Sequence, residues 1–398
     1  MRHYALTAMG MVNVLGDRLE TIEPRLFAGD VSRLQEHPLR TTGERVLIGR
    51  VREELPGFPP RMQHYDCRNH RLILAATSQI AEEAEAVVRR FGADRVAVVM
   101  GSSTAGLDAS EQAFFHWREH GALPAQFAYE TQHEMGSVSK LVADLTGARG
   151  PAYTHSTACT SSAKVFASAA SLLDMGICDA VITGGVDVLC SVPLNGFEAL
   201  GSLTREHTLP MSRHRTGLII GEGAAMFVLT RERRDGAVHL RGIGESCDAH
   251  HISAPHPDGL GAEAAMRGAL ADADLAPDEV HYLNLHGTGT PLNDAMEAKA
   301  VTRVFDGIPC SSTKPLVGHG LGVAGATELG FCWLALTRGR AGDYPLPPHV
   351  WDGQADEVLP TMNLVAAGGR LSRSGPVRFM SNSFAFGGNN CSVIIERS

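Results

Sequence analysis

Two segments made largely of small residues constrain the fold of this 398-residue chain more than any other feature. They are STACTSSAKVFASAASLLDMG at 156–176 and HGLGVAGATELGFCWLALTRG at 319–339. A helix without a polar face has no side for water, so it must lie between two other layers of structure. Each segment also carries one reactive residue near its start, Cys159 or His319. We therefore expect two related halves, each with a buried central helix.

Short strand-like runs alternate with helical stretches along the rest of the chain. They lie at 95–103, 178–187, 224–232, 279–287 and 389–397. Buried strands separated by helices predict an α/β fold. The chain is longer than the roughly 250–300 residues that one hydrophobic core normally supports. We place the boundary after a charged segment at 231–236, which gives halves of 1–236 and 237–398.

Composition narrows the classes of function. The net charge is −9 with no basic run, which argues against a nucleic-acid binder. No stretch of about 18 consecutive apolar residues is present, so we expect no membrane span. The eight cysteines form no CxxC pair, which argues against a zinc or thioredoxin-type site and fits a reduced, cytoplasmic protein.

Cys159 stands where a helix is expected to begin. The thiolate is the reactive form of cysteine, and the partial positive charge and free N–H groups of a helix N-terminus favour an anion there. The same N–H groups could hold the oxyanion of an acyl-transfer intermediate. Alternatively, Cys159 is a small residue needed for tight packing, as Ser161 and Ser162 would be. The segment alone leaves both interpretations open.

Three further segments combine glycines with chemically capable side chains. His286 follows a strand-like run and precedes the loop GTGTPLND and a helix with Glu297, although it could merely bond the loop backbone. Lys314, one of only four lysines, and His319 lie in a glycine-rich stretch that lacks the order of a phosphate-binding loop. Phe386 stands in SNSFAFGGNN, where it could be a movable gate or a core residue.

Together these segments resemble the β-ketoacyl-acyl-carrier-protein synthases of the KAS I/II type, which belong to the thiolase superfamily. The resemblance runs in order along nearly the whole chain. Its motifs are ALTAMGMVNVLG, MGSSTAGL, GARGPAYTHSTACTSSA, GGVD, GEGAA, DAHHISAPHPDG, LHGTGTPLND, SSTKPLVGHGLGVAGATE and NSFAFGGNN. It implies a thiolase fold, with two related α/β halves stacked as five layers (α-β-α-β-α) with mixed sheets.

The resemblance implies a role for each matching residue. Cys159 would be the nucleophile, and His286 and His319 would promote decarboxylation of a malonyl unit. Lys314 would lie near the histidines, and Glu297 would order this network. The N–H groups of Cys159 and Phe386 would form the oxyanion hole, with Phe386 also the gate. Further residues would contact the phosphopantetheine arm (Thr288, Thr290), line the acyl pocket (Phe197, Leu321) and dock the carrier protein (Arg68, Arg71, Arg205).

The resemblance also implies partners and a reaction. The chain would extend an acyl thioester to a 3-oxoacyl-acyl-carrier-protein in fatty acid, polyketide or aryl-polyene-type biosynthesis, with no metal and no cofactor beyond the carrier's phosphopantetheine arm. An acyl carrier protein would be the partner, together with a homodimer mate or a related ketosynthase or chain-length-factor subunit. Alternatives are a non-catalytic chain-length factor, a non-decarboxylating thiolase and a soluble acyl-binding module, and the Cys159/His286/His319 set argues against the first two.

Three segments depart from the family pattern. Ala385 replaces the usual glycine before the gating phenylalanine, which puts the kinetics of the gate in question. The chain reads LPMS at 209–212 where many members have Arg-Pro-Phe-Asp, and GNN where they have GTN after the gate. None of these changes touches a reactive group.

Overall fold

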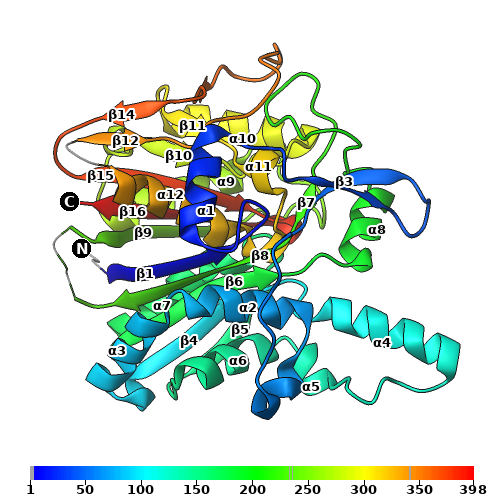
Figure 1. The fold of residues 1–398 in the computed structure, drawn as a ribbon. Coiled ribbons are helices and arrows are strands. Elements are labelled where there is room, and N and C mark those ends of the chain that lie inside the picture. The colour runs from blue at the N-terminus through cyan, green and yellow to red at the C-terminus, as the bar shows by residue number, and fades with distance from the viewer. Residues whose placement is uncertain (1–3, 233, 235, 340–341) are drawn as a thin grey trace.

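A large mixed sheet runs through the computed structural model, which describes residues 4–232, 234, 236–339 and 342–398 (Figure 1). Among these residues the sheet has eleven strands, in the order β13-β11-β10-β15-β16-β9-β1-β8-β6-β4-β5. Their bounds are β1 Tyr4–Val12, β4 Val96–Gly101, β5 Ala152–His155, β6 Ala180–Asp187, β8 Gly223–Thr230, β9 Val238–Cys247, β10 Tyr282–Asn284, β11 Pro309–Ser311, β13 Asn363–Leu364, β15 Val377–Phe384 and β16 Asn389–Arg397. Each predicted strand-like run overlaps one of these strands, and β8 begins one residue before the predicted run at 224–232.

The strands of the sheet lie on both sides of the predicted boundary at 236, and the boundary itself stays a prediction. β1, β4, β5, β6 and β8 come from the first half, and the other strands of the sheet come from the second (Figure 1). The halves meet where Tyr4–Leu6 of β1 pair antiparallel with Val238–Leu240 of β9, so the sheet is continuous. Residues 233 and 235, beside the predicted boundary at 236, lie outside the described residues.

Two central helices lie between the halves, as predicted from their small residues. α7 (Ser161–Asp174) packs on β4 and β6 and also on β16, while α12 (Ala324–Arg338) packs on β15 and also on β8. The helices contact each other, and a Cβ added at Gly325 of α12 would come within 2.8 Å of the Cβ of Ala163 on α7. Small residues are therefore required for the two helices to approach this closely.

Outer helices complete the five layers. α2 (Arg68–Ser78), α3 (Ala81–Phe91) and α6 (Ser137–Thr146) pack on strands of the first half. α9 (Leu260–Ala273) packs on β9 and β16, with α10 (Pro291–Val304) against it. The two halves of the continuous sheet form the two β layers, because α7 and α12 each pack on strands of both halves. The fold is thus layered α-β-α-β-α, as expected. No helix within the described ranges is long and apolar enough to cross a membrane.

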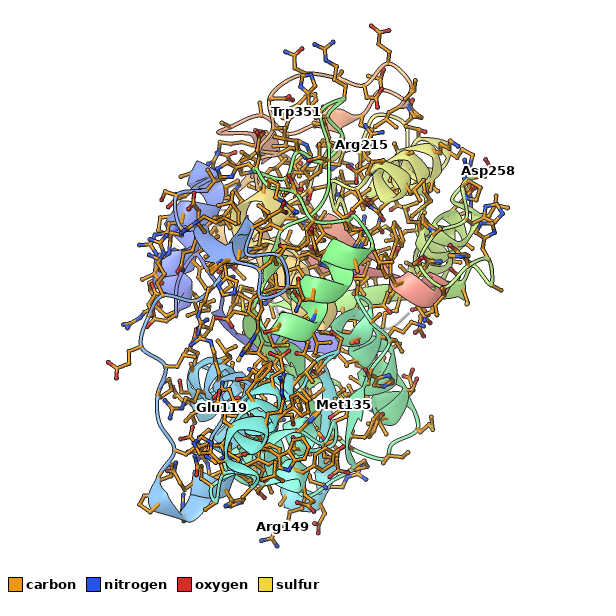
Figure 2. All side chains as sticks on the ribbon, turned by 90° about the vertical axis from the view of Figure 1, so that its right-hand side faces the viewer. Glu119, Met135, Arg149, Arg215, Asp258 and Trp351 are labelled. Carbon is orange, nitrogen blue, oxygen red and sulfur yellow. The ribbon has the colours of Figure 1, made fainter. Side chains whose placement is uncertain are left out.

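Smaller elements surround the opening between the halves. An arm formed by α4 (Leu107–His120) and α5 (Tyr129–Gln132) extends from the first half (Figure 1). α8 (Ser191–Ala199) is the green helix at the centre of Figure 2, between the arm with Glu119 below and the loops with Arg215 and Trp351 above. The remaining elements are α1 Leu19–Ala28, α11 Lys314–Val317, β2 Gln35–Pro38, β3 Arg45–Gly49, β7 Ile220–Gly221, β12 Asp343–Pro345, β14 Arg370–Ser372 and short 3-10 turns at Pro60–Tyr65, Ala93–Arg95, Pro277–Glu279, Leu321–Val323 and Phe386–Gly388.

Candidate active site

Cys159 lies in a tight turn just before α7, as the sequence predicts. Ala158 adopts a positive φ of 50°, which turns the chain sharply and directs it into the helix that begins at Ser161. Cys159 is only 6% exposed, yet it lines a cavity of about 230 Å³ between the two halves. This position gives a ligand in the cavity access to the sulfur while bulk water is largely excluded.

Burial outweighs the helix terminus in setting the acidity of this thiol. Burial raises the pKa of Cys159 to about 11, although the Lys314 charge and the backbone N–H groups of Phe386 and Cys159 act to lower it. Desolvation of the thiolate is therefore a larger effect than the stabilisation that the N–H groups near the start of the helix provide. A nearby base is needed to take the proton.

His319 lies where such a base would be needed. Its Nε2 lies 3.0 Å from the Cys159 sulfur. His286 is next to it, and the two imidazole rings meet edge to face with centroids 5.2 Å apart. The ligating atoms of Cys159, His286 and His319 all lie within 4.8 Å of one another. The structure thus brings three residues from three separate sequence segments to one point in the cavity.

The backbone of His319 lies beside a strand and not, as the sequence predicts, at the start of a helix. The sequence analysis placed it at the start of a helix, but α12 begins five residues later, at Ala324, after a 3-10 turn. Leu321 has a positive φ of 57°, which interrupts the helix. The backbone of His319 instead pairs with β7, donating its N–H to Ile219 and accepting from Gly221. The ring is thus fixed by a strand edge and not by a helix terminus.

Both histidines are neutral over the physiological range. Burial lowers the pKa of His286 and of His319 well below the usual value, and the Lys314 charge lowers both further. Neither Nδ1 atom has a hydrogen-bond partner among the described residues. The protein therefore does not fix the tautomer of either ring through Nδ1, and each Nε2 could accept or donate a proton.

A buried ion pair supports the histidines from behind. Lys314 is 1% exposed, donates to the backbone carbonyl of His286 and pairs with Glu328 on α12. Glu297 does not pair with Lys314 but holds the backbone of the histidine loop. It accepts the backbone N–H groups of His286 and Gly287, both at 2.7 Å. The carboxylate paired with Lys314 is Glu328, which the sequence analysis missed.

The positive charge of Lys314 also bears on metal binding. The spacing of Cys159, His286 and His319 would suit a metal ion by distance alone. However, Lys314 lowers the pKa of all three groups, which means that its charge is felt at each of them. The same field disfavours a bound cation. The expectation of no metal stays a prediction.

The Phe386 loop closes one side of the cavity. Its ring packs against Phe197 of α8, with centroids 5.4 Å apart. Gly387 donates its N–H to Ile252 and Gly388 accepts from Asp248, both at 2.8 Å, so a neighbouring loop holds the turn. The backbone N–H of Phe386 acts to lower the pKa of the Cys159 thiol. This arrangement suits an oxyanion hole made of the Phe386 and Cys159 N–H groups.

Most of the expected substrate-binding residues line the same cavity. Thr288 and Thr290 do so, with their hydroxyl oxygens 2.9 Å apart, and Phe197 does so as well. Leu321 does not line it. Leu321 is instead buried in a cluster of apolar side chains against which Phe197 packs. Leu321 could therefore line the acyl pocket only if the acyl chain of the substrate entered this cluster.

The three arginines expected to dock a carrier protein are already paired with carboxylates. Arg68 binds the buried Glu222, and Arg71 binds Asp66 through two hydrogen bonds. Arg205 contacts both Glu44 and Glu198. Each of the three arginines therefore has a carboxylate partner within this chain. A role for them in carrier docking stays a prediction.

Comparisons with known proteins agree with this geometry. Residues 6–235 match the family "Beta-ketoacyl synthase, N-terminal domain", and residues 238–343 match "Beta-ketoacyl synthase, C-terminal domain". Nodulation protein E of Rhizobium leguminosarum is 32% identical, with 98% of each chain covered. The 3-oxoacyl-[acyl-carrier-protein] synthase 2 of Vibrio cholerae is 30% identical, with 100% of this chain and 99% of the relative covered.

Solved structures show the same fold. A chain from the complex of the ketosynthase ApeO with its chain length factor ApeC, from Xenorhabdus doucetiae, superposes with a TM-score of 0.93. It is 41% identical and covers 100% of this chain and 98% of its own. A β-ketoacyl synthase from Burkholderia phymatum superposes with a TM-score of 0.87, at 27% identity and complete coverage of both chains.

Proposed function

Because the chain belongs to the β-ketoacyl synthase family, we propose that Cys159, His286 and His319 carry out its decarboxylative condensation. The protein is a β-ketoacyl-acyl-carrier-protein synthase, an acyltransferase of the thiolase fold. The product is a 3-oxoacyl-acyl-carrier-protein. The observation that carries the assignment of residues is the convergence of the three reactive groups within 4.8 Å in one cavity.

Cys159 performs the first half of the reaction. Its sulfur attacks the carbonyl carbon of the incoming acyl thioester while the proton passes to Nε2 of His319, 3.0 Å away. As the acyl–sulfur bond to Cys159 forms, the bond to the carrier's sulfur breaks, and that sulfur takes the proton from His319 and leaves as a thiol. The N–H groups of Cys159 and Phe386 stabilise the oxyanion. A thioester on cysteine then remains reactive toward a carbanion.

The two histidines perform the second half. The malonyl unit loses its carboxylate as carbon dioxide, and negative charge develops on its thioester oxygen. His286 and His319 donate N–H groups to this oxygen, and their neutral state in the buried site lets them do so without a competing charge. The carbanion attacks the Cys159 thioester, and the cysteine leaves as a thiolate. Lys314 and Glu297 position the histidine loop through its backbone.

Other residues serve the substrates. Thr288 and Thr290 contact the phosphopantetheine arm, supported by their place on the cavity wall. Phe386 moves to separate acylation from extension, supported by its packing on Phe197 and by Gly387 and Gly388, which follow it. An acyl carrier protein delivers both substrates. A cytoplasmic location belongs to this proposal and is supported by the eight cysteines, all without a disulfide.

A partner subunit is also part of the proposal. Strand β5 ends the sheet, and Ala152 and Tyr153 on it are exposed, so its free edge could pair with another strand. The partner is a second copy or a chain-length factor, in line with the ApeO–ApeC complex. A purely non-catalytic role for this chain is disfavoured by the intact Cys159–His319 contact, which such a role does not need.

Histidine variants test the division of roles. His286→Ala should slow carbon dioxide release from malonyl-acyl-carrier-protein by on the order of 10²–10³, because one donor to the developing oxyanion is lost. It should still accept an acyl group on Cys159, whereas His319→Ala should slow both steps. His207→Ala, an exposed histidine, is the matched control. Decarboxylation at the wild-type rate in His286→Ala would remove this residue from the proposed mechanism.

A further inference from the structure

A second cavity shares an apolar cluster of side chains with the active-site cavity. Its volume is about 210 Å³, and Leu189 and Leu194 form part of its wall. The active-site cavity is lined by Phe197 and Leu218. The three leucines belong to one apolar cluster, which also contains Leu321, and Phe197 packs against that cluster. The two cavities therefore share a partition of leucines and one phenylalanine, side chains that can change rotamer.

The second cavity is polar beyond this partition. Arg40, Arg50 and His37 line it, and Arg40 stacks on the ring of Phe115 at 3.5 Å. The acidic side chains are Asp108 and Glu111, both from α4. A charged and aromatic compartment at the far side of a leucine partition is not what an entirely apolar acyl chain would need.

Asp108 carries the evidence for a ligand. It is only 7% exposed, and its Oδ1 is buried without a hydrogen-bond partner among the described residues. Burial raises the pKa of Asp108 to about 6, so the group is still mainly a carboxylate at neutral pH. A buried acceptor without a donor is unfavourable and rare in native proteins. A ligand with a hydroxyl group would satisfy it.

Glu111 connects this cavity to the gate. Its two carboxylate oxygens accept the N–H groups of Ser191 and Val192, at 2.8 and 2.6 Å, and so hold the first turn of α8. The same helix carries Phe197, which packs on Phe386. The position of the gate is thus mechanically linked to the wall of the second cavity.

We propose that a long acyl chain on Cys159 passes the leucine partition and that the second cavity binds a hydroxyl group at its far end, with Asp108 as the acceptor. The substrate class is a long acyl chain hydroxylated at the end remote from the thioester. Leu321 then borders the path of the chain within the partition. This inference rests on the proposed function, because it requires acylation of Cys159.

Matched pairs of acyl chains test the inference. The full-length protein, with its partner subunit if one co-purifies, is given carrier protein loaded with octanoyl to hexadecanoyl chains and with their ω-hydroxy counterparts. Acylation of Cys159 is followed by intact-mass spectrometry. Above a threshold length, kcat/KM should favour the hydroxylated chain by about ten- to a hundredfold, as expected for a hydrogen bond to a charged acceptor. Shorter pairs should show no difference.

Two variants locate the effect. Asp108→Asn and Asp108→Leu should reduce or abolish the preference for ω-hydroxy chains, while Glu206→Gln, which removes an exposed carboxylate from a cavity that Asp108 does not line, should keep it. The wild-type comparison stands even if a variant fails to fold. Acylation without any preference, or a preference that survives both Asp108 variants, would overturn the inference and leave the proposed function intact. Absence of acylation by every chain would contradict the proposed function itself.

Discussion

Cys159 must lose its proton in an environment with little water, because its side chain is buried against His319 and the Phe386 loop. The resting thiol is therefore mostly protonated, and the imidazole at 3.0 Å has to accept the proton during attack. The neutral state of His319 makes this transfer feasible. The same burial keeps the nucleophile from reacting with molecules that do not fill the cavity.

The pH dependence of alkylation follows from this state. Because the thiolate is the reactive form and the pKa of Cys159 is raised to about 11, the thiolate fraction grows about tenfold for each pH unit below that value. The rate of iodoacetamide modification at Cys159, followed by peptide mass spectrometry, should rise throughout pH 7–9 without a plateau. A plateau below pH 8 would show that the thiolate is already stabilised in the resting protein.

The sequence identifies reactive residues well where a motif surrounds them. Cys159, His286 and His319 each stand among glycines or small residues next to a buried element, and the structure brings them together. Glu328 has no such local signal, since it lies within an otherwise apolar helix. Its signal is indirect: a buried lysine such as Lys314 requires a carboxylate partner, but the fold must be known to find which one.

At the scale of elements, the gate is a short turn held from two sides. The 3-10 turn Phe386–Gly388 is tied to Asp248 and Ile252 by backbone hydrogen bonds, while its ring rests on α8. Ala385 before it has φ −108° and ψ 156°, an extended conformation open to any residue. Alanine here introduces no strain, but it restricts the chain more than the glycine usual in the family.

Restoring the glycine should loosen the gate. Ala385→Gly should lower the free energy of unfolding by about 0.4–1 kcal/mol, because glycine gains more conformational freedom in the unfolded chain. Deuterium exchange of a peptide spanning 385–390 should become faster, while peptides from α9 serve as an internal control. If exchange at 385–390 does not change, the neighbouring loop and not residue 385 controls the mobility of the gate.

Element types were more predictable from sequence than element ends. The small-residue segments become the buried α7 and α12 because such helices fit only between layers. The predicted start of α12, His319, was five residues too early, since no local sequence signal indicates the positive φ at Leu321. The ion pairs of Arg68 with Glu222 and of Arg205 with Glu44 could not be predicted either, because these partners come together only in the folded chain.

At the scale of the whole molecule, the candidate active site lies where the two halves of the chain meet. Cys159 comes from the first half and both histidines from the second. The halves are joined by the pairing of β1 with β9 and by the contact of α7 with α12. The sequence predicts two related halves, but it cannot show that their strands form one continuous sheet, because that depends on pairing between distant segments.

Because β5 is an exposed edge of the sheet, we expect this chain to associate there with a second subunit. Tyr153→Asp places a charge on β5 and should prevent strand pairing there, so the mass from light scattering should fall from a dimer to the 42.4 kDa of one chain. Val358→Asp, at a residue that is 81% exposed in the second half, is the control and should leave the mass unchanged. A wild-type protein that is already a monomer without a co-purifying subunit would contradict the proposed use of this edge.

Intact-mass spectrometry tests the central claim most directly. The protein is incubated with acyl-loaded carrier protein and then with malonyl-loaded carrier protein, alongside Cys159→Ala. We expect an acyl adduct that maps to Cys159 and disappears as a 3-oxoacyl product two carbons longer forms on the carrier, with neither event in the variant. Condensation by Cys159→Ala, or an adduct mapped to another residue, would contradict the account of this site.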